Sequence, residues 1–227
     1  MKGPRIYFSL RSPYSWLAYR DLIGRYPALA RALEWRPFWE PDETSLRALT
    51  GAGGRFHYTP MSKAKNLYIL RDVRRLTAER GLDLTWPVDR KPHWEVPHLA
   101  YLAAAEAGRG PGFVALAYRR RWEQGADLCA RATIADIAGE LGLDPAPLTS
   151  AVDDPRLRAK GVAALLDLDR DGVFGVPFFC CGTEKFWGLD RLDGFATMVR
   201  TKRDITVAED FTTASLPGWE SHAGGCG

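Results

Sequence analysis

The sequence predicts a mixed α/β fold whose two halves are separated by a large all-α insertion. A short apolar run, a helix start and a second apolar run occupy residues 5–39. Helical periodicity then continues over 41–170, and strand-like apolar runs return from Asp171 onwards, followed by one more helix. Strands and helices at both ends of the chain, with helices between them, are the order expected of such a fold.

The composition is that of a folded globular protein. The 227 residues are 46% hydrophobic and 26% charged, with a formal net charge of +3, which excludes disordered and fibrous classes. Basic and acidic residues are interleaved, so no basic stripe for nucleic acid is formed. No apolar stretch reaches the about 18 residues of a membrane span, and the first ten residues lack the apolar core of a secretion signal. We therefore expect a cytoplasmic protein without nucleic-acid or membrane partners.

The cysteines indicate neither a disulfide scaffold nor a metal site. Cys129, Cys180, Cys181 and Cys226 include no C-x-x-C pair, and the histidines are scattered, so zinc-ligand spacing is absent and no metal is expected. Adjacent cysteines in an apolar run are interpreted as buried strand residues. A redox role for Cys180 and Cys181 is the alternative.

The amino-terminal segment predicts a strand, a helix and a second strand. Residues 5–10 are apolar and aromatic, as in a buried strand. Ser12 followed by Pro13 predicts a helix start, because a serine hydroxyl accepts an orphan backbone N–H and proline has none to lose. We expect this helix to end near Tyr26 and the second strand to cover 33–39.

The middle of the chain is predicted to be helical. Amphipathic stretches cover 63–80, 96–107 and 113–123. Thr133 is predicted to cap a further helix, and Asp154 followed by Pro155 another. After them, strands are expected at 176–181 and 185–187.

Pro177 opens the first of these two strands. A trans proline is tolerated in that position only at a sheet edge. A cis Val176–Pro177 bond would instead turn the chain sharply and leave the backbone N–H and C=O of Val176 free to pair with a ligand.

This order of elements is that of a thioredoxin-like fold with a large all-α insertion. The thioredoxin-like domain is expected to comprise 1–40 and 171–203, split by the helical insertion 41–170. Residues 204–227 are polar and end in glycines, and we expect them to form a partly disordered tail.

Three segments resemble one family. Residues 7–15 are similar to the active-site segment of DsbA-like thioredoxin-fold oxidoreductases, with S-P-Y-S where those have C-x-x-C. Residues 172–177, G-V-F-G-V-P, and 186–193, F-W-G-L-D-R-L-D, resemble signature segments of the 2-hydroxychromene-2-carboxylate isomerase and kappa-class glutathione transferase family. The helix that carries Lys65, Tyr68 and Asp72 matches the insertion of that family.

The missing cysteines limit the chemistry. Disulfide exchange requires a thiolate, so Ser12 and Ser15 exclude a dithiol oxidoreductase at this site. A helix N-terminus with exposed N–H donors and a partial positive charge still stabilises a thiolate supplied from outside. The resemblance implies that this thiol is glutathione, or another low-molecular-weight thiol, and that Ser12 donates its hydroxyl hydrogen to the sulfur. The alternative is that Ser12 only caps the helix.

The resemblance also implies residues that hold the thiol. Val176 and Pro177 would pair with its cysteinyl unit. Asp190, where the last helix begins, would accept the ammonium of a γ-glutamyl group, with plain helix capping as the alternative. Lys65 would hold a carboxylate of the thiol or of the substrate.

Tyr68 and Asp72 share one helix face with Lys65, because the three lie at positions i, i+3 and i+7. We expect Tyr68 and Asp72 to contact the substrate. Charge on a helix face is often only solvated, and Asp72 with Arg75 would also form an ordinary i,i+3 ion pair.

The function implied by the resemblance is a glutathione-dependent isomerase, which adds the thiolate reversibly to a conjugated carbonyl compound of small size. A kappa-type glutathione S-transferase and a DsbA-like binding protein without thiol chemistry are the alternatives. A Ser-His-Asp hydrolase is disfavoured, because no G-x-S-x-G segment is present. The resemblance suggests a homodimer, and no sequence feature marks its interface.

Some positions depart from the family's pattern. Pro97 and His98 stand where Asn-Thr is common, which removes a side-chain amide that can contact the thiol. Leu189 replaces a polar residue beside Asp190, and Phe178 follows Pro177 where threonine is usual.

Overall fold

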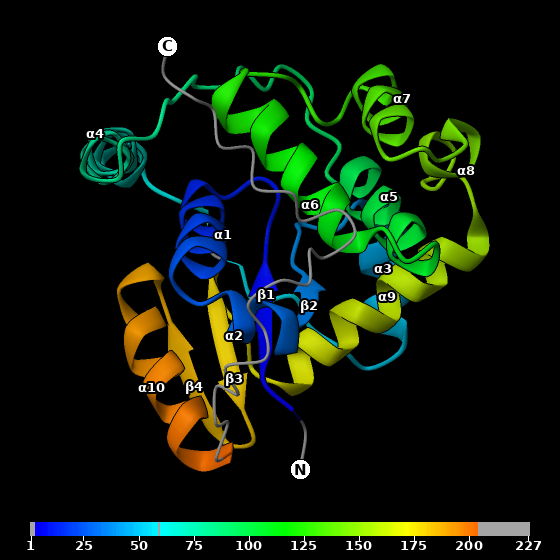
Figure 1. Cartoon of the computed structure of the whole chain (residues 1–227). Coiled ribbons are helices and arrows are strands. Elements are labelled where there is room, and N and C mark those ends of the chain that lie inside the picture. Colours follow the sequence, from blue (N-terminus) through cyan, green and yellow to red (C-terminus); the bar gives the residue numbers. More distant parts are fainter. Residues whose placement is uncertain (1–2, 59, 204–227) are drawn as a thin grey trace.

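A mixed sheet of four strands lies at the centre of the fold (Figure 1). The computed structural model describes residues 3–58 and 60–203; the tail expected at 204–227 lies outside them. The strands are β1 (Arg5–Phe8), β2 (Glu34–Pro37), β3 (Phe178–Cys181) and β4 (Glu184–Trp187), in the order β2-β1-β3-β4. β1 pairs with β2 in parallel, and the other two pairs are antiparallel.

The helices follow β1, and most of them lie between β2 and β3 in the sequence. They are α1 (Pro13–Arg25), α2 (Pro27–Ala32), α3 (Glu43–Gly51), α4 (Lys63–Glu79), α5 (Glu95–Glu106), α6 (Gly110–Tyr118), α7 (Arg131–Glu140), α8 (Pro145–Thr149), α9 (Pro155–Arg170) and α10 (Leu192–Arg203). A π-helical turn, η1 (Arg119–Glu123), continues α6, and a 3₁₀ turn, η2 (Leu189–Arg191), leads into α10. The strand–helix–strand start, the helical middle and the strand–strand–helix end agree with the predicted order.

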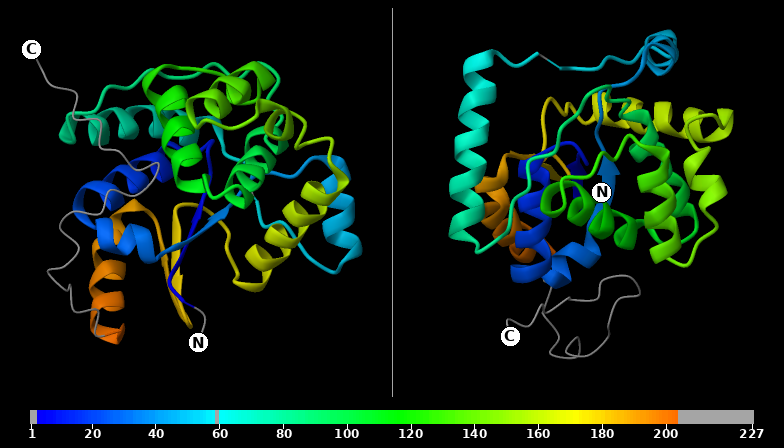
Figure 2. Two further views of the ribbon diagram at one scale, coloured as in Figure 1. Left: turned by 45° about the vertical axis from the view of Figure 1, so that its right-hand side comes forward. Right: turned by 90° about the horizontal axis from the view of Figure 1, so that it is seen from above.

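The sheet is covered on both faces, because successive side chains of a strand point to opposite sides. Phe179 of β3 stacks on Phe195 of α10, with ring centroids 5.2 Å apart. Tyr7 of β1 lies on the other face and donates its hydroxyl to Asp171, just after α9, at 2.6 Å. Figures 1 and 2 show α10 and α9 on opposite sides of the strands.

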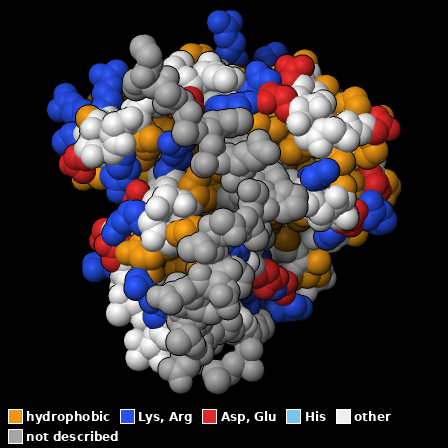
Figure 3. All heavy atoms as spheres, in the orientation of Figure 1, with side chains coloured by type: hydrophobic (Ala, Val, Ile, Leu, Met, Phe, Trp, Pro, Cys, Tyr) orange, Lys and Arg blue, Asp and Glu red, His pale blue; other side chains and the backbone are white. Residues whose placement is uncertain are grey.

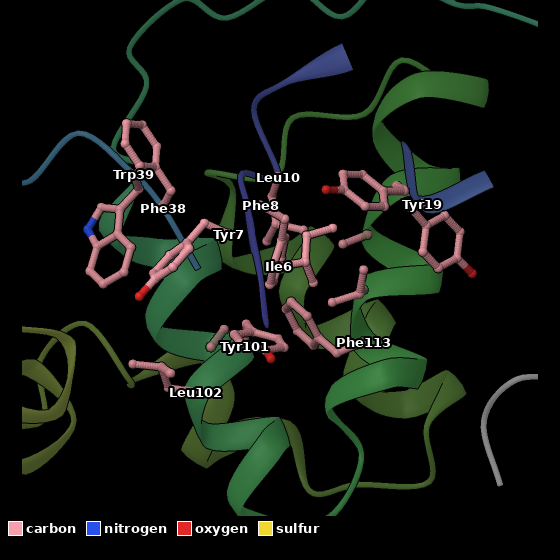
Figure 4. Close-up of a cluster of buried hydrophobic side chains, with 14 of the residues drawn as sticks. Ile6, Tyr7, Phe8, Leu10, Tyr19, Phe38, Trp39, Tyr101, Leu102 and Phe113 are labelled. Atoms are coloured by element: carbon pink, nitrogen blue, oxygen red, sulfur yellow. The ribbon is translucent and has the colours of Figure 1, made fainter. Parts of the chain in front are cut away.

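One hydrophobic core joins the sheet to the helical insertion. Its centre is α5, whose residues 95–104 are all buried. The ring of Phe8 in β1 meets Tyr101 of α5 edge-on, with centroids 5.2 Å apart, and Tyr101 in turn contacts Phe113 of α6. Figure 4 shows these rings gathered around β1. The packing of the insertion therefore fixes the strand that leads directly into α1.

Two details of the helical segments differ from the sequence prediction. Thr133 does not cap α7: the helix begins at Arg131 with Ala130 as its N-cap. The carboxylate of Asp127 accepts the N–H of Cys129 in the turn before the helix, and the last extended residue is Ala130, three positions before Thr133. The short α2 was not predicted, although Pro27 stands at its first position, where proline favours a helix start.

A buried ion pair ties β1 to the end of α9. Arg5 Nη1 lies 2.8 Å from Asp171 Oδ2, and the two side chains are 2% and 10% exposed. Because removing one partner leaves a charge buried without compensation, Asp171→Ala is expected to lower the free energy of unfolding by about 3–5 kcal/mol. Asp153→Ala, which breaks the exposed pair with Arg131, should change it little. Chemical denaturation checks both, and equal effects would contradict the buried pair's role.

Candidate active site

A cavity of about 540 Å³ opens between α1, α4 and the segment that follows β4. The view from above in Figure 2 shows α4 as a long rod beside α1 and α10. The lining residues are Tyr14, Asp21, Arg25, Tyr68, Asp72, Leu76, Arg80, Val176, Pro177, Trp187, Gly188, Leu189, Asp190 and Asp193. The cavity thus brings together five of the residues predicted for the site: Tyr68, Asp72, Val176, Pro177 and Asp190. Ser12 and Lys65 are not in the lining.

The N-terminus of α1 borders this cavity through Tyr14. Ser12 is the N-cap, and its Oγ accepts the N–H of Ser15 at 3.2 Å. Pro13 has no N–H, and Trp16 donates to the carbonyl of Ser12. Within the described chain the backbone N–H of Tyr14 has no partner, so one donor of the first turn remains available on a residue that lines the cavity.

Ser12 therefore caps its helix, as one of the two interpretations predicted. Capping uses a lone pair of the hydroxyl oxygen and leaves its hydrogen available for donation. Ser15 has a different role. Its side chain is fully buried, and its Oγ accepts the N–H of Ser9 at 3.2 Å, which closes the loop between β1 and α1.

His98 supports the same loop from α5. Its Nε2 accepts the N–H of Leu10 at 3.2 Å, which requires that Nδ1 carry the hydrogen and donate it to the carbonyl of Trp94 at 2.7 Å. The ring is fully buried and stacked on Trp39. Burial lowers the pKa of His98 to about 3. Position 98 lies in the core here, so its side chain supports the loop before Ser12 and does not face the cavity.

The Val176–Pro177 bond is cis, as predicted. Among the described residues, the backbone N–H and C=O of Val176 have no hydrogen-bond partner. The carbonyl of Pro177 accepts the N–H of Gly188 at 3.0 Å. This bond places the start of η2 directly beside Pro177 in the cavity wall.

Asp190 lies inside η2 and does not cap it, because Gly188 is the N-cap residue. Gly188 has a φ of +110°, and a Cβ there would lie 2.6 Å from Asp190 Oδ1. Only glycine fits this position without strain. The side chain of Asp190 is 73% exposed, and its nearest cation is Arg191, with Nε 3.5 Å from Oδ2.

Asp72 of α4 is a hydrogen-bond centre. Its Oδ2 accepts the hydroxyl of Tyr14 at 2.8 Å, and its Oδ1 accepts from Tyr68 at 3.2 Å and Arg75 at 2.9 Å. Burial raises the pKa of Asp72, but these hydrogen bonds outweigh it and the pKa is lowered. The predicted Asp72–Arg75 pair is formed, and the contact with Tyr14 fastens α4 to the start of α1.

Lys65 lies at the exposed outer end of α4, where residues 62–68 are all exposed. It is less than one turn from Tyr68 and outside the cavity lining. In the space-filling view, Lys and Arg side chains gather where α4 lies (Figure 3). Lys65 is therefore placed at the rim of the cavity.

Two arginine–aspartate pairs in the wall were not predicted. Arg80 forms a fork with Asp21, with Nε and Nη2 each 2.9 Å from a carboxylate oxygen. Arg25 pairs with Asp193 at 2.8 Å. The sequence did contain a signal for these wall residues, because Tyr14, Asp21 and Arg25 lie at positions i, i+7 and i+11 and share one face of α1. Tyr68, Asp72 and Leu76 of α4 and its C-cap residue Arg80 likewise follow one another at every fourth position.

Cys180 and Cys181 are not joined by a disulfide in this fold. Cys180 is buried and Cys181 is partly buried, and both are free thiols. Adjacent strand residues point to opposite faces of the sheet. Burial also raises the pKa of Cys180. Within residues 3–58 and 60–203 there is no group of three potential metal ligands, and no helix there is long and apolar enough to span a membrane.

We compared the chain with known proteins to find the class to which this fold and this helix N-terminus belong. The family described as DSBA-like thioredoxin domain matches residues 5–200, and the chain belongs to that family. Similar solved structures include a probable DsbA oxidoreductase from Streptomyces coelicolor, at TM-score 0.63 and 18% identity, covering 94% of this chain and 92% of that one.

The resemblance to one isomerase is more particular. 2-Hydroxychromene-2-carboxylate isomerase from Sphingobium xenophagum is 30% identical in an alignment 192 residues long, and the match covers 82% of this chain and 92% of that protein. A solved structure of 2-hydroxychromene-2-carboxylate isomerase has TM-score 0.67 and 20% identity, covering 89% of this chain and 98% of that one. The cytosolic disulfide reductase DsbM from Pseudomonas aeruginosa, solved with GSH, has TM-score 0.57 and 18% identity, with coverages of 88% and 98%. The predicted resemblance is thus confirmed.

The buried His98 predicts a pH dependence of stability. The unfolded side chain has its ordinary pKa of 6.5, whereas the folded one has a pKa of about 3. Between these values acid protonates only the unfolded chain. As the pH is lowered from 6.5 toward 3, the free energy of unfolding should therefore fall by about 1.4 kcal/mol for each pH unit because of this group.

Denaturation of the wild type and of His98→Gln over this pH range measures the difference. Glutamine still accepts from the Leu10 N–H but does not titrate, so the variant should show a shallower pH slope. His98→Asn serves as the second variant should His98→Gln fail to fold. Parallel slopes for wild type and variant would contradict the assignment.

Proposed function

We propose that the protein is an isomerase that uses glutathione or a related low-molecular-weight thiol to act on a small conjugated carbonyl compound. The observation that carries the proposal is the N-terminus of α1, which has a capping serine, no sulfur of its own and an unpartnered N–H on Tyr14, a residue that lines the cavity. The resemblance to 2-hydroxychromene-2-carboxylate isomerase supports the reaction class.

The residues present fit the sulfur and the peptide backbone of such a thiol. The Ser12 hydroxyl hydrogen and the Tyr14 N–H are donors for a thiolate, and the helix terminus adds a partial positive charge. Lowering a thiol pKa by one unit corresponds to about 1.4 kcal/mol of preferential anion binding. The free N–H and C=O of Val176 match a cysteinyl unit held in extended conformation.

When bound, the thiol supplies a thiolate that adds reversibly to the conjugated carbonyl compound and lets its former double bond rotate before elimination. The chain holds the thiol deprotonated at the α1 terminus and holds its backbone at Val176. Tyr68, 57% exposed at the cavity, offers a ring face to the substrate. Asp72 fixes the hydroxyls of Tyr14 and Tyr68. In this proposal Lys65, at the rim, holds a carboxylate of the thiol or of the substrate.

Variants at Ser12 separate capping from thiolate binding. Ser12→Ala should lose about 1 kcal/mol of stability and weaken thiol binding at least tenfold. Ser12→Asp keeps a good capping oxygen, so stability should be retained, but its charge repels a thiolate and binding should be lost. Calorimetric titration with glutathione and thermal unfolding measure the two effects. Unchanged binding in both variants would overturn the role of Ser12.

Ser12→Cys tests the helix terminus without any added ligand. A thiol introduced there should titrate at least one unit below the ordinary value of about 8.5. The difference in thiolate absorbance between this variant and the wild type, followed against pH, reports this value, because the native cysteines contribute to both proteins. A titration at or above 8.5 would show that the terminus does not stabilise sulfur anions.

The reaction itself is tested with a cis-conjugated carbonyl acid as substrate. Interconversion of the cis and trans isomers should require both the protein and a thiol, and Ser12→Ala should slow it at least tenfold. Accumulation of a stable thioether in place of the rearranged isomer would identify a transferase. Thiol binding without either reaction would identify a binding protein.

A further inference from the structure

The N-terminus of α1 has no sulfur of its own, but the same chain carries a cysteine close to a glycine-rich stretch. Cys226 stands in the sequence Gly-Gly-Cys-Gly at 224–227, within the segment 204–227 that lies outside the described residues. The other cysteines belong to the folded part, where Cys180 is buried and Cys129 and Cys181 are partly buried. Glycine neighbours have no side chains. Cys226 is therefore the cysteine whose neighbours best suit entry into a peptide-sized cavity.

The segment is long enough for Cys226 to reach the cavity. Asp190 of η2 and Asp193 of α10 both line the cavity, so α10 starts at its wall. The 12 residues of α10 extend about 18 Å, which places the far end of this helix at about that distance from η2. Residues 204–226 span up to about 75 Å when fully extended. A group tethered by a linker that spans the required distance competes at an effective concentration of the order of millimolar.

The charges of this segment complement those of α4. Residues 204–227 contain neither lysine nor arginine. Their carboxylates are those of Asp204, Glu209, Asp210 and Glu220. On α4, Lys63, Arg71 and Arg74 lie at i, i+8 and i+11 and therefore share one face, and all three are exposed. An acidic segment is thus attracted to the outer side of α4, where Lys and Arg side chains gather (Figure 3).

The cations of this face have no ion-pair partner within the described chain. The ion pairs of α4 involve Arg75 and the C-cap residue Arg80 instead. The same helix contributes Tyr68 and Asp72 to the cavity lining. A segment that follows the basic face of α4 is therefore led to the rim of the cavity.

At the cavity, the backbone groups that suit an external thiol suit a segment of this chain equally well. The N–H and C=O of Val176 have no partner among the described residues, and they match the backbone of any extended peptide. The N–H of Tyr14 is also unpartnered. The partial positive charge at the start of α1 stabilises a cysteine thiolate whatever chain carries it.

We propose that the segment 204–227 is an internal ligand of the thiol site: its carboxylates dock on the basic face of α4, and Cys226 places its sulfur at the N-terminus of α1. An external thiol then has to displace Cys226 before it binds. The inference rests on the proposed thiol site and adds a form of regulation to it. Docking forms no covalent bond, and the thiol proton of Cys226 passes to solvent.

The position of Cys226 is tested by crosslinking in the full chain. Ser12→Cys places a second thiol at the start of α1, and oxidation with diamide should join it to Cys226 with loss of the two thiol hydrogens. Ser62→Cys is the matched control, because Ser62 caps α4 as Ser12 caps α1 and is exposed. Mass spectrometry with peptide mapping should show the disulfide to Cys226 forming at least tenfold faster in Ser12→Cys. Equal rates in the two variants would overturn the proposal.

The role of α4 is tested by charge reversal in the Ser12→Cys background. Arg71→Glu with Arg74→Glu should slow the crosslink severalfold at low ionic strength, and this effect should vanish in about 1 M salt, where the Debye length is about 3 Å. Arg47→Glu with Arg170→Glu, at exposed arginines of α3 and α9, changes the net charge equally and should leave the rate unchanged. Equal slowing by both double variants would exclude docking on α4.

Competition is measured by calorimetric titration with glutathione. Cys226→Ala removes the internal sulfur, so this variant should bind glutathione at least threefold more tightly than the wild type does. Ser221→Ala changes the same segment but keeps Cys226, and its affinity should equal that of the wild type. Equal affinities of the wild type and Cys226→Ala would overturn the competition.

The outcomes separate this inference from the proposed function. Glutathione binding that is the same with and without Cys226, together with unselective crosslinking, refutes the internal ligand and leaves the proposed function standing. A selective crosslink in a protein that binds no external thiol, even as Cys226→Ala, refutes the proposed function and leaves the docked segment standing.

Discussion

The site depends on the closure of the loop between β1 and α1. Ser9 donates its N–H to Ser15, Ser15 donates its own to Ser12, and Leu10 donates to His98. Each of these hydrogen bonds gives an acceptor to a backbone N–H that would otherwise lack one, and together they fix where the helix begins. The partial charge of a helix terminus acts over about one turn only. A displaced loop would therefore move the charge away from the cavity.

The helical insertion contributes to that closure as much as the sheet does. His98 reaches the loop from α5, and Phe8, Tyr101 and Phe113 anchor β1 to the same helical layer. The parts expected at 1–40 with 171–203 and at 41–170 share this core. An α-helical insertion of this kind acts as a support for the first strand, and it also supplies α4 as a cavity wall.

The local signals in the sequence were sufficient for the order of elements. Ser12 with Pro13 and Asp154 with Pro155 marked helix starts, since capping is decided by a few adjacent residues. Contacts between residues that are distant in the sequence could not be predicted from such local signals. The burial of His98 was not predicted, because whether a histidine is buried depends on residues such as Trp39 that are distant in sequence. The Asp21–Arg80 fork joins α1 to α4, and no local pattern specifies which helix a charged stripe faces.

The two sides of the cavity are anchored to the molecule very differently. The α1 terminus is embedded in buried hydrogen bonds, whereas α4 buries only Val73 and Thr77 and is otherwise largely on the surface. Amino-acid substitutions on α4 are therefore expected to lower the stability of the fold only slightly. Substitutions around Ser12 are expected to lower it more. Evolution of such a chain toward new substrates can therefore proceed by substitutions on α4, which leave the loop between β1 and α1 unchanged.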